Sequence, residues 1–167
     1  MNIVWFNGPS AVNFYHIRPA VEIGCNFISD RRAVQHVCVY DGEVINRLKT
    51  DSTVKYWTRK NFTTETFKLV HTDTRYSCSG TMALQLAFNL GLKDVYLLGC
   101  DWTHTDRSVF DEKYKWRTGL PKKVNNVRIK IVESISAPIN LTHVTDRPPI
   151  FAGVNTMPSN KFLDITC

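Results

Sequence analysis

The sequence lacks the short motifs that identify many nucleotide-binding and hydrolytic enzymes. No Gly-x-Gly-x-x-Gly follows the first apolar segment, and neither a Walker phosphate loop nor a Gly-x-Ser-x-Gly nucleophile elbow occurs. No two histidines have the His-x-x-x-His or His-Glu-x-x-His spacing. These absences exclude the usual dinucleotide fingerprint and leave zinc hydrolysis without support, so we expect no bound metal.

The cysteines also lack the spacing of a metal site or a disulfide framework. There is no Cys-x-x-Cys pair, no histidine at zinc-finger spacing, and the total of 5 is odd. Cys25, Cys38 and Cys100 lie in or beside apolar segments, where a free thiol packs as a small apolar group. We therefore expect structural thiols.

Long apolar runs and a targeting segment are absent as well. No stretch approaches the roughly 18 apolar residues that span a bilayer. The amino terminus has neither a basic lead nor a cleavable apolar core, so we expect a cytoplasmic protein. The 167 residues suffice for one domain, residues 1–167, with its own core.

Positive charge is in excess but dispersed. The formal net charge of +6 attracts anions such as nucleotides, nucleic acids or acidic surfaces. Its clusters, at Arg31-Arg32, residues 113–117 and Lys122-Lys123, are weaker than the continuous basic stripe of a dedicated nucleic-acid binder. The charge therefore favours a small anionic partner over nucleic acid without ruling the latter out, and an oligomer is compatible with the sequence.

Residues 77–102 carry the clearest structural pattern in the sequence. They predict a loop, a helix, a tight turn and a buried strand, in that order. Apolar residues recur there at helical spacing, at Met82, Ala83, Leu86, Ala87 and Leu90. Ser79 is the expected N-cap, and Gly91 is placed for a left-handed C-terminal cap. Residues 95–98 form an unbroken apolar run, typical of a central parallel strand.

Strand and helix patterns alternate along the whole chain. We expect strands at 3–6, 21–28, 37–40, 54–57, 67–70, 95–98 and 141–144, and helices at 43–49, 127–135 and 161–165. This alternation predicts an α/β fold, a three-layer Rossmann-like domain with a mostly parallel sheet. The irregular segment 103–123 follows a central strand and is predicted to be a lid loop.

Polar residues follow several of these strands. In open α/β sheets, ligands bind at the carboxyl ends of the strands. Asn7-Gly8-Pro9-Ser10 closes the first strand: Gly8 allows close backbone approach, Pro9 fixes the turn, and the segment that Ser10 can cap would suit a phosphate. Asn26 lies within the second strand, and Asp101 follows the central one opposite Ser79 and Gly80. The alternative is that Asp101 and Ser79 only cap local backbone.

These elements, taken in order, resemble a known family. The segments are Asn7-Gly8-Pro9-Ser10, Cys25-Asn26, Ser79-Gly80 and residues 96–102. Together they are similar to the bacterial sialyltransferases that make lipooligosaccharide termini, and to the wider Rossmann-like group that includes archaeal pterin pyrophosphokinases. The likeness covers about residues 1–115.

The resemblance implies a pocket for a cytidine-nucleotide donor. The loop of Asn7, Gly8, Pro9 and Ser10 would lie beneath the phosphate, Asn26 would bind the ribose or phosphate, and Ser79 and Gly80 would meet the nucleotide. Asp101 and Trp102 would end the strand at the same pocket. Lid residues would complete it, with Tyr114 stabilising the leaving phosphate and Lys115 supplying charge.

The chain departs from that family at the catalytic base, which is a histidine after the lid. No histidine lies between Asp106 and His143. His104 or His143 could serve instead, because histidine titrates near neutral pH, and we favour His104.

We expect a glycosyltransferase that moves a sugar from a nucleotide donor to an unknown acceptor and requires no cofactor. One alternative is a pyrophosphokinase, which would bind magnesium through Asp41, Asp73 and Asp101. The other is a non-catalytic module that binds a nucleotide or another ligand on the same fold.

Overall fold

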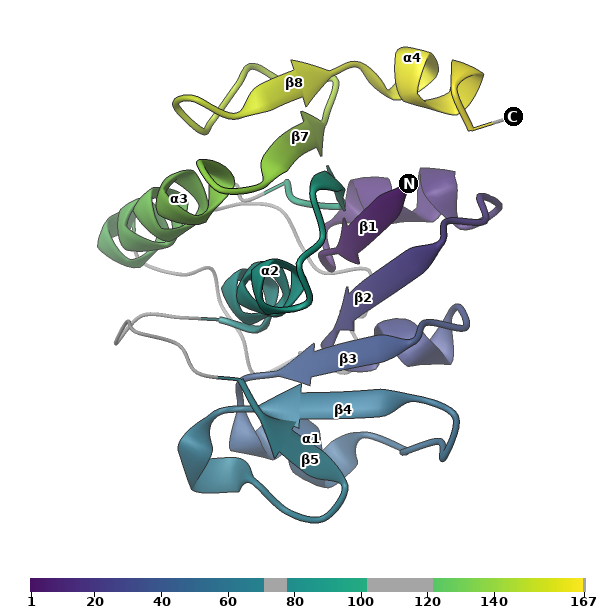
Figure 1. Cartoon of the computed structure of the whole chain (residues 1–167), viewed down its shortest axis with the longest axis vertical. Helices are drawn as coiled ribbons and strands as arrows, with labels where there is room; N and C mark the ends of the chain where they lie inside the picture. The colour runs from purple at the N-terminus through teal and green to yellow at the C-terminus, as the bar shows by residue number, and fades with distance from the viewer. Residues whose placement is uncertain (71–77, 102–121, 167) are drawn as a thin grey trace.

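The chain forms one parallel sheet in the computed structural model, which describes residues 1–70, 78–101 and 122–166. Its strand order is β5-β4-β3-β2-β1-β6-β7-β8, and every pairing is parallel. The strands are β1 (Asn2–Trp5), β2 (Val21–Cys25), β3 (His36–Val39), β4 (Lys55–Thr58), β5 (Phe67–Leu69), β6 (Asp94–Leu98), β7 (Asn140–Val144) and β8 (Asn155–Met157). Figure 1 shows this order from β5 at the bottom to β8 at the top. The predicted α/β, Rossmann-like fold is confirmed.

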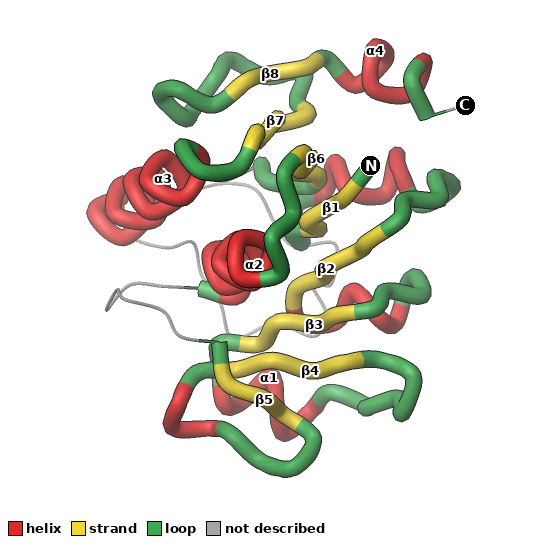
Figure 2. The backbone as a smooth tube through the Cα atoms, in the orientation of Figure 1, coloured by secondary structure: helices red, strands yellow, loops and turns green. Residues whose placement is uncertain are grey.

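Helices cover both faces of the sheet. The α-helices are α1 (Gly42–Arg47), α2 (Ser79–Asn89), α3 (Lys122–Ser136) and α4 (Ser159–Asp164), and the 3-10 helices are η1 (Pro9–Phe14), η2 (Asn26–Asp30) and η3 (Lys60–Phe62). The longer α2 and α3 lie on one face, and the short η1, α1 and α4 lie on the other (Figure 2). In the described part of the chain, no helix is both long and apolar enough to cross a bilayer.

β6 is apolar from Val95 to Leu98 because both faces of this part of the strand are covered. Val95 and Leu97 pack in the core beneath α2, whereas Leu98 packs in the core on the opposite face. The strand pairs with β1 on one side and β7 on the other. This confirms the central strand predicted from the unbroken run.

α2 ends as predicted but begins differently. At its carboxyl end, Gly91 has φ +71° and donates its N–H to the carbonyl of Phe88, while Leu92 donates its N–H to the carbonyl of Ala87. These two hydrogen bonds form a Schellman cap. At its amino end the N-cap is Cys78, so the prediction of Ser79 as N-cap is wrong. Ser79 is instead the first helical residue, and its hydroxyl bonds outside the helix.

Two other boundaries differ by several residues from the sequence-based expectation, and one strand was not predicted. The second strand stops at Cys25, before the predicted 28, because Asn26 has φ 54° and turns the chain into η2. Helix α3 begins at Lys122, five residues before the predicted start and inside the expected lid segment. β8 was not predicted, because its Asn-Thr-Met sequence carries no apolar pattern.

The order of the strands creates a switch point between β1 and β6. From β1 the chain builds outward through β2 to β5, and it then returns to place β6 on the other side of β1. The carboxyl ends of β1 and β6 therefore lie at a switch point, where this strand order predicts a ligand-binding crevice. Crevices of this kind are where open α/β sheets bind ligands.

A buried ion pair joins Glu22 of β2 to Arg32, which follows η2, and Arg32 also bonds to the segment after η1. Arg32 donates from Nε to Glu22 Oε2 at 2.9 Å and pairs through Nη2 with the other carboxylate oxygen. It also donates to the carbonyls of Tyr15 and Ile17 at 3.1 and 3.2 Å, and its guanidinium lies 4.4 Å from the ring centroid of Trp5. Burial raises the pKa of Glu22, and Arg32 offsets part of that rise.

We expect Arg32→Met to lower the free energy of unfolding by about 3–5 kcal/mol, because it leaves Glu22 buried without its cation. Urea denaturation of wild type and variant measures the difference. Lys130→Met, which removes an exposed cation from α3, is the control and should change stability by less than about 0.5 kcal/mol. Equal, small effects of the two substitutions would contradict the assignment.

Candidate functional site

The loop after β1 lies directly against the end of β6. The N–H of Gly8 donates to the carbonyl of Gly99 at 2.8 Å, and the N–H of Ser10 donates to Asp101 Oδ2 at 3.0 Å. Asp101 is only 8% exposed, so this contact holds a carboxylate inside the crevice. The two loops at the switch point are therefore bonded to each other.

Gly8 is required there for space. Its φ of −68° is open to any residue, but a Cβ would lie 2.2 Å from Asp101 Oδ2 and 2.4 Å from the Gly99 carbonyl oxygen. Gly99 differs, since its φ of +68° is in the left-handed region that favours glycine. Both glycines allow the backbone of the two loops to approach closely, so that the N–H of Gly8 reaches the carbonyl of Gly99.

Ser79 joins the start of α2 to the ends of β2 and β3. Its hydroxyl donates to Asn26 Oδ1 at 2.6 Å and accepts the N–H of Tyr40 at 3.0 Å. Asn26 and Ser79 are both buried. One hydroxyl thus links three strand-end segments that are distant in the sequence.

This arrangement fixes the orientation of the Asn26 amide. The Ser79 hydroxyl accepts from the Tyr40 N–H and donates to Asn26 Oδ1, so the amide oxygen of Asn26 is turned toward Ser79. The NH₂ group therefore points away from Ser79, and it donates to no described residue. An amide NH₂ in this position can donate to an oxygen acceptor.

The loop after β1 and the start of α2 are in direct contact. A Cβ on Gly80 would lie 2.0 Å from Cε1 of Phe6, so glycine is needed where the ring of Phe6 meets the helix. Asn7 follows Phe6 directly, and its loop is thereby placed beside Ser79 and Gly80.

The structure thus brings most of the sequence-predicted residues to one edge of the sheet. Asn7, Gly8, Ser10, Asn26, Ser79, Gly80 and Asp101 lie along the carboxyl ends of β6, β1 and β2, and Pro9 opens η1 at the same edge. Trp102, His104, Tyr114 and Lys115, together with Asp73, lie outside the described residues. The expected lid and base belong to that second group.

His143, the other candidate base, is buried in β7 beside this edge. It is 2% exposed, its Nε2 lies 3.1 Å from the carbonyl oxygen of Cys100, and its ring packs on Phe151. Since a carbonyl only accepts, Nε2 carries the proton, and Nδ1 then has no partner among the described residues. His143 therefore holds the end of β6 in place and supports Asp101 through the backbone.

Metal ligands are not gathered at this edge in the part of the chain that the structure describes. No group of three or more His, Cys, Asp or Glu side chains is arranged there to hold an ion. Cys25, Cys38 and Cys100 are buried free thiols, as expected, and burial raises their pKa values. They are packed as apolar groups.

Sequence reasoning missed Tyr40 and Arg59, which extend the edge across β3 and β4. Tyr40 follows β3 and bonds to Ser79, and Arg59 follows β4 and lies over the ring of Tyr40. Their position directly after two predicted strands was the available signal, because parallel strands end at the same edge.

A hollow lies at the opposite edge of the sheet, where the strands begin. It is lined by residues that precede β3 and β4, among them Arg32, Lys49, Asp51 and Val54, with Tyr56 of β4. None of the candidate site residues contributes to it. The hollow is therefore separate from the crevice at the switch point.

Comparison with known proteins adds no relative. No protein-family model, curated protein or solved structure matches this chain.

The buried histidines predict how stability depends on pH. Burial lowers the pKa of His143 and of His36, whose Nδ1 accepts a hydrogen bond from Trp57. Below the ordinary histidine value of 6.5 the unfolded chain binds protons that the folded chain does not. Stability should therefore fall as pH drops from 7 to 5, by at most about 1.4 kcal/mol per pH unit for each histidine.

Urea denaturation across this range measures the slope. His143→Gln retains a donor for the Cys100 carbonyl but does not titrate, so it should make the slope shallower, and His36→Gln should do so separately. A slope that neither substitution changes would contradict the assignment.

Proposed function

We propose that the crevice at the switch point binds a nucleotide, and that the protein is a nucleotide-sugar-dependent glycosyltransferase. The observation that carries the proposal is the fixed amide of Asn26, whose donors are directed away from Ser79. It lies at the edge where the Gly8 loop and the start of α2 meet.

The chemistry at this edge suits a phosphate-bearing donor. The NH₂ group of Asn26, which is turned away from Ser79, can donate to a phosphate leaving group without a metal. The N–H groups of Gly8 and Ser10 are already bonded to Gly99 and Asp101 and hold the two loops together. The net charge of +6 favours approach of such an anion. In the reaction, an acceptor hydroxyl attacks the sugar, the sugar–phosphate bond breaks, and the nucleotide leaves with its phosphate held by these donors.

Support for a cytidine base and for a sialyltransferase-like reaction comes from the sequence resemblance. The residues that carry the resemblance, Asn7, Asn26 and Ser79, lie at the same edge of the sheet, which supports the proposal. Roles for His104, Tyr114 and Lys115 as base and phosphate-stabilising groups are part of the same proposal.

Isothermal titration with a panel of nucleoside monophosphates and nucleotide sugars tests the proposal, and we expect cytidine nucleotides to bind. Asn26→Asp replaces the amide donors with a carboxylate, which repels phosphate, and should weaken binding at least about tenfold. Aspartate can still accept from Ser79, and it tolerates the left-handed backbone.

Asn89→Asp, at the exposed far end of α2, makes the same chemical change away from the crevice and should leave binding unaltered. Failure of every nucleotide and nucleotide sugar to bind the wild-type protein would refute the proposal. Turnover that requires Mg²⁺ and transfers pyrophosphate would replace it with the pyrophosphokinase alternative.

A further inference from the structure

Arg59 is held by aromatic rings at the carboxyl edge of the sheet. Its guanidinium carbon lies 4.6 Å from the ring centroid of Tyr40 and 4.6 Å from that of Phe62. Tyr40 follows β3, Arg59 follows β4, and Phe62 ends η3. Contact with two rings restricts a long side chain that would otherwise sample many rotamers.

The charge of Arg59 is not neutralised by the described part of the protein. The side chain forms no hydrogen bond or ion pair with a described residue, and its Nε is buried without a partner. Stacking uses the faces of the guanidinium, whereas its N–H donors lie in the plane and remain available. The remaining donors are the two Nη groups, which form no hydrogen bond with a described residue.

Comparison with Arg32 shows what a structural arginine does in this fold. Arg32 also lies over an aromatic ring, that of Trp5, but its donors reach Glu22 and two backbone carbonyls. Arg59 has the aromatic contacts without acceptors among the described residues. Its guanidinium can therefore bind an anionic ligand through the donors that Arg32 uses within the protein.

Arg59 is connected to the candidate crevice through a single residue. Tyr40 contacts Arg59 with its ring and donates its backbone N–H to Ser79, which in turn orients Asn26. Among the crevice residues that the structure describes, Asp101 is negative and the others are neutral. Within the described part of this network, Arg59 is the residue that can give a phosphate-bearing ligand a counter-charge, whereas Lys115 lies outside the described residues.

We propose that Arg59 is an anion-binding residue of this edge and that its Nη groups bind a phosphate oxygen of the ligand. The inference rests on the proposed nucleotide site and extends it from the ends of β1 and β6 across β3 to β4. It assigns the ligand class as a nucleotide with a phosphate directed toward Tyr40. The rings of Tyr40 and Phe62 hold the guanidinium in place before the ligand arrives.

The test compares binding of cytidine monophosphate and of inorganic pyrophosphate by isothermal titration. Arg59→Gln should weaken both at least about tenfold, because charge-assisted hydrogen bonds are lost. Arg59→Lys keeps the charge but not the planar fork, and should lie between wild type and Arg59→Gln.

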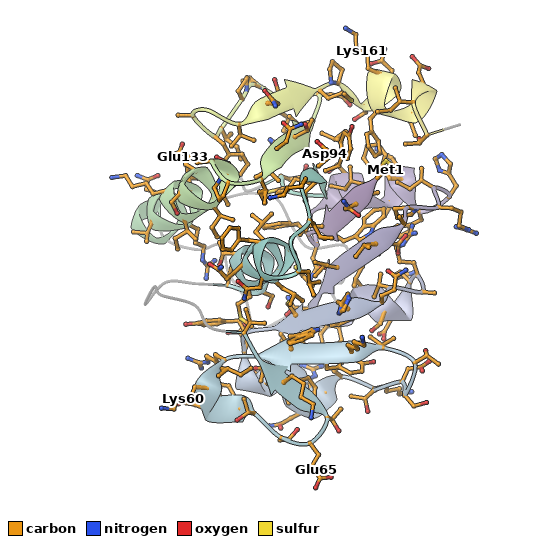
Figure 3. All side chains as sticks on the ribbon, in the orientation of Figure 1. Met1, Lys60, Glu65, Asp94, Glu133 and Lys161 are labelled. Carbon is orange, nitrogen blue, oxygen red and sulfur yellow. The ribbon has the colours of Figure 1, made fainter. Side chains whose placement is uncertain are left out.

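Lys60→Gln is the matched control. Lys60 is the next residue, is exposed and points outward from the molecule (Figure 3), so its loss removes the same charge from the same region. We expect less than a twofold change. Equal weakening by Arg59→Gln and Lys60→Gln would reduce the effect to general electrostatic attraction and would overturn the assignment.

The outcomes separate this inference from the proposed function. If cytidine monophosphate binds and Arg59→Gln binds it equally well, the role of Arg59 is refuted and the nucleotide site stands. If pyrophosphate alone binds, and only with Arg59 present, the anion site stands and the nucleotide proposal fails. Binding of neither ligand refutes both.

A measurement on the wild-type chain avoids dependence on the fold of the variants. The Arg59 Nε–Hε signal in a ¹⁵N NMR spectrum should shift as pyrophosphate is added, whereas signals of Arg32, whose donors are already bonded, should not. An unchanged Arg59 signal at saturating pyrophosphate would overturn the proposal.

Discussion

The close approach of the loop after β1 to the end of β6 is the constraint on which the candidate site depends. Strand order places these two strands side by side in the sheet. The crevice keeps its shape because Gly8 leaves no Cβ between itself and Asp101, and because Gly99 takes a left-handed turn. Hydrogen bonds from Gly8 and Ser10 then join the two loops. His143 supports the same segment from β7 through the carbonyl of Cys100.

A second set of contacts determines the orientation of the Asn26 amide at this edge. The hydroxyl of Ser79 accepts from Tyr40 and donates to Asn26, so the Asn26 amide turns its oxygen toward Ser79 and its NH₂ group away. Under the proposed function, this NH₂ group is a preorganised donor, and donors of this kind stabilise negative charge without reorganising. Arg59, beyond Tyr40, would add the positive charge that the amide lacks.

Much of this edge could be predicted from sequence, because it follows from local rules. Unbroken apolar runs predict parallel strands, and polar residues directly after them mark the carboxyl edge of the sheet. Gly91 predicts the end of α2. The role of Ser79 could not be predicted, because a serine before an apolar helix has the pattern of an N-cap whether its hydroxyl bonds locally or across the fold. The aromatic contacts of Arg59 are also tertiary, since Tyr40 is brought to it only by the pairing of β3 with β4.

The central claim is that the ends of β1, β2 and β6 and the start of α2 form one nucleotide site. Hydrogen–deuterium exchange with and without cytidine monophosphate tests it most directly, because one experiment reports on all of these segments. The account predicts slower exchange on ligand binding in residues 6–10, 26–30, 78–82 and 99–101, which are separated in sequence and joined only at the switch point. Slower exchange confined to residues 49–56, at the opposite edge of the sheet, or no change at saturating nucleotide, would contradict it.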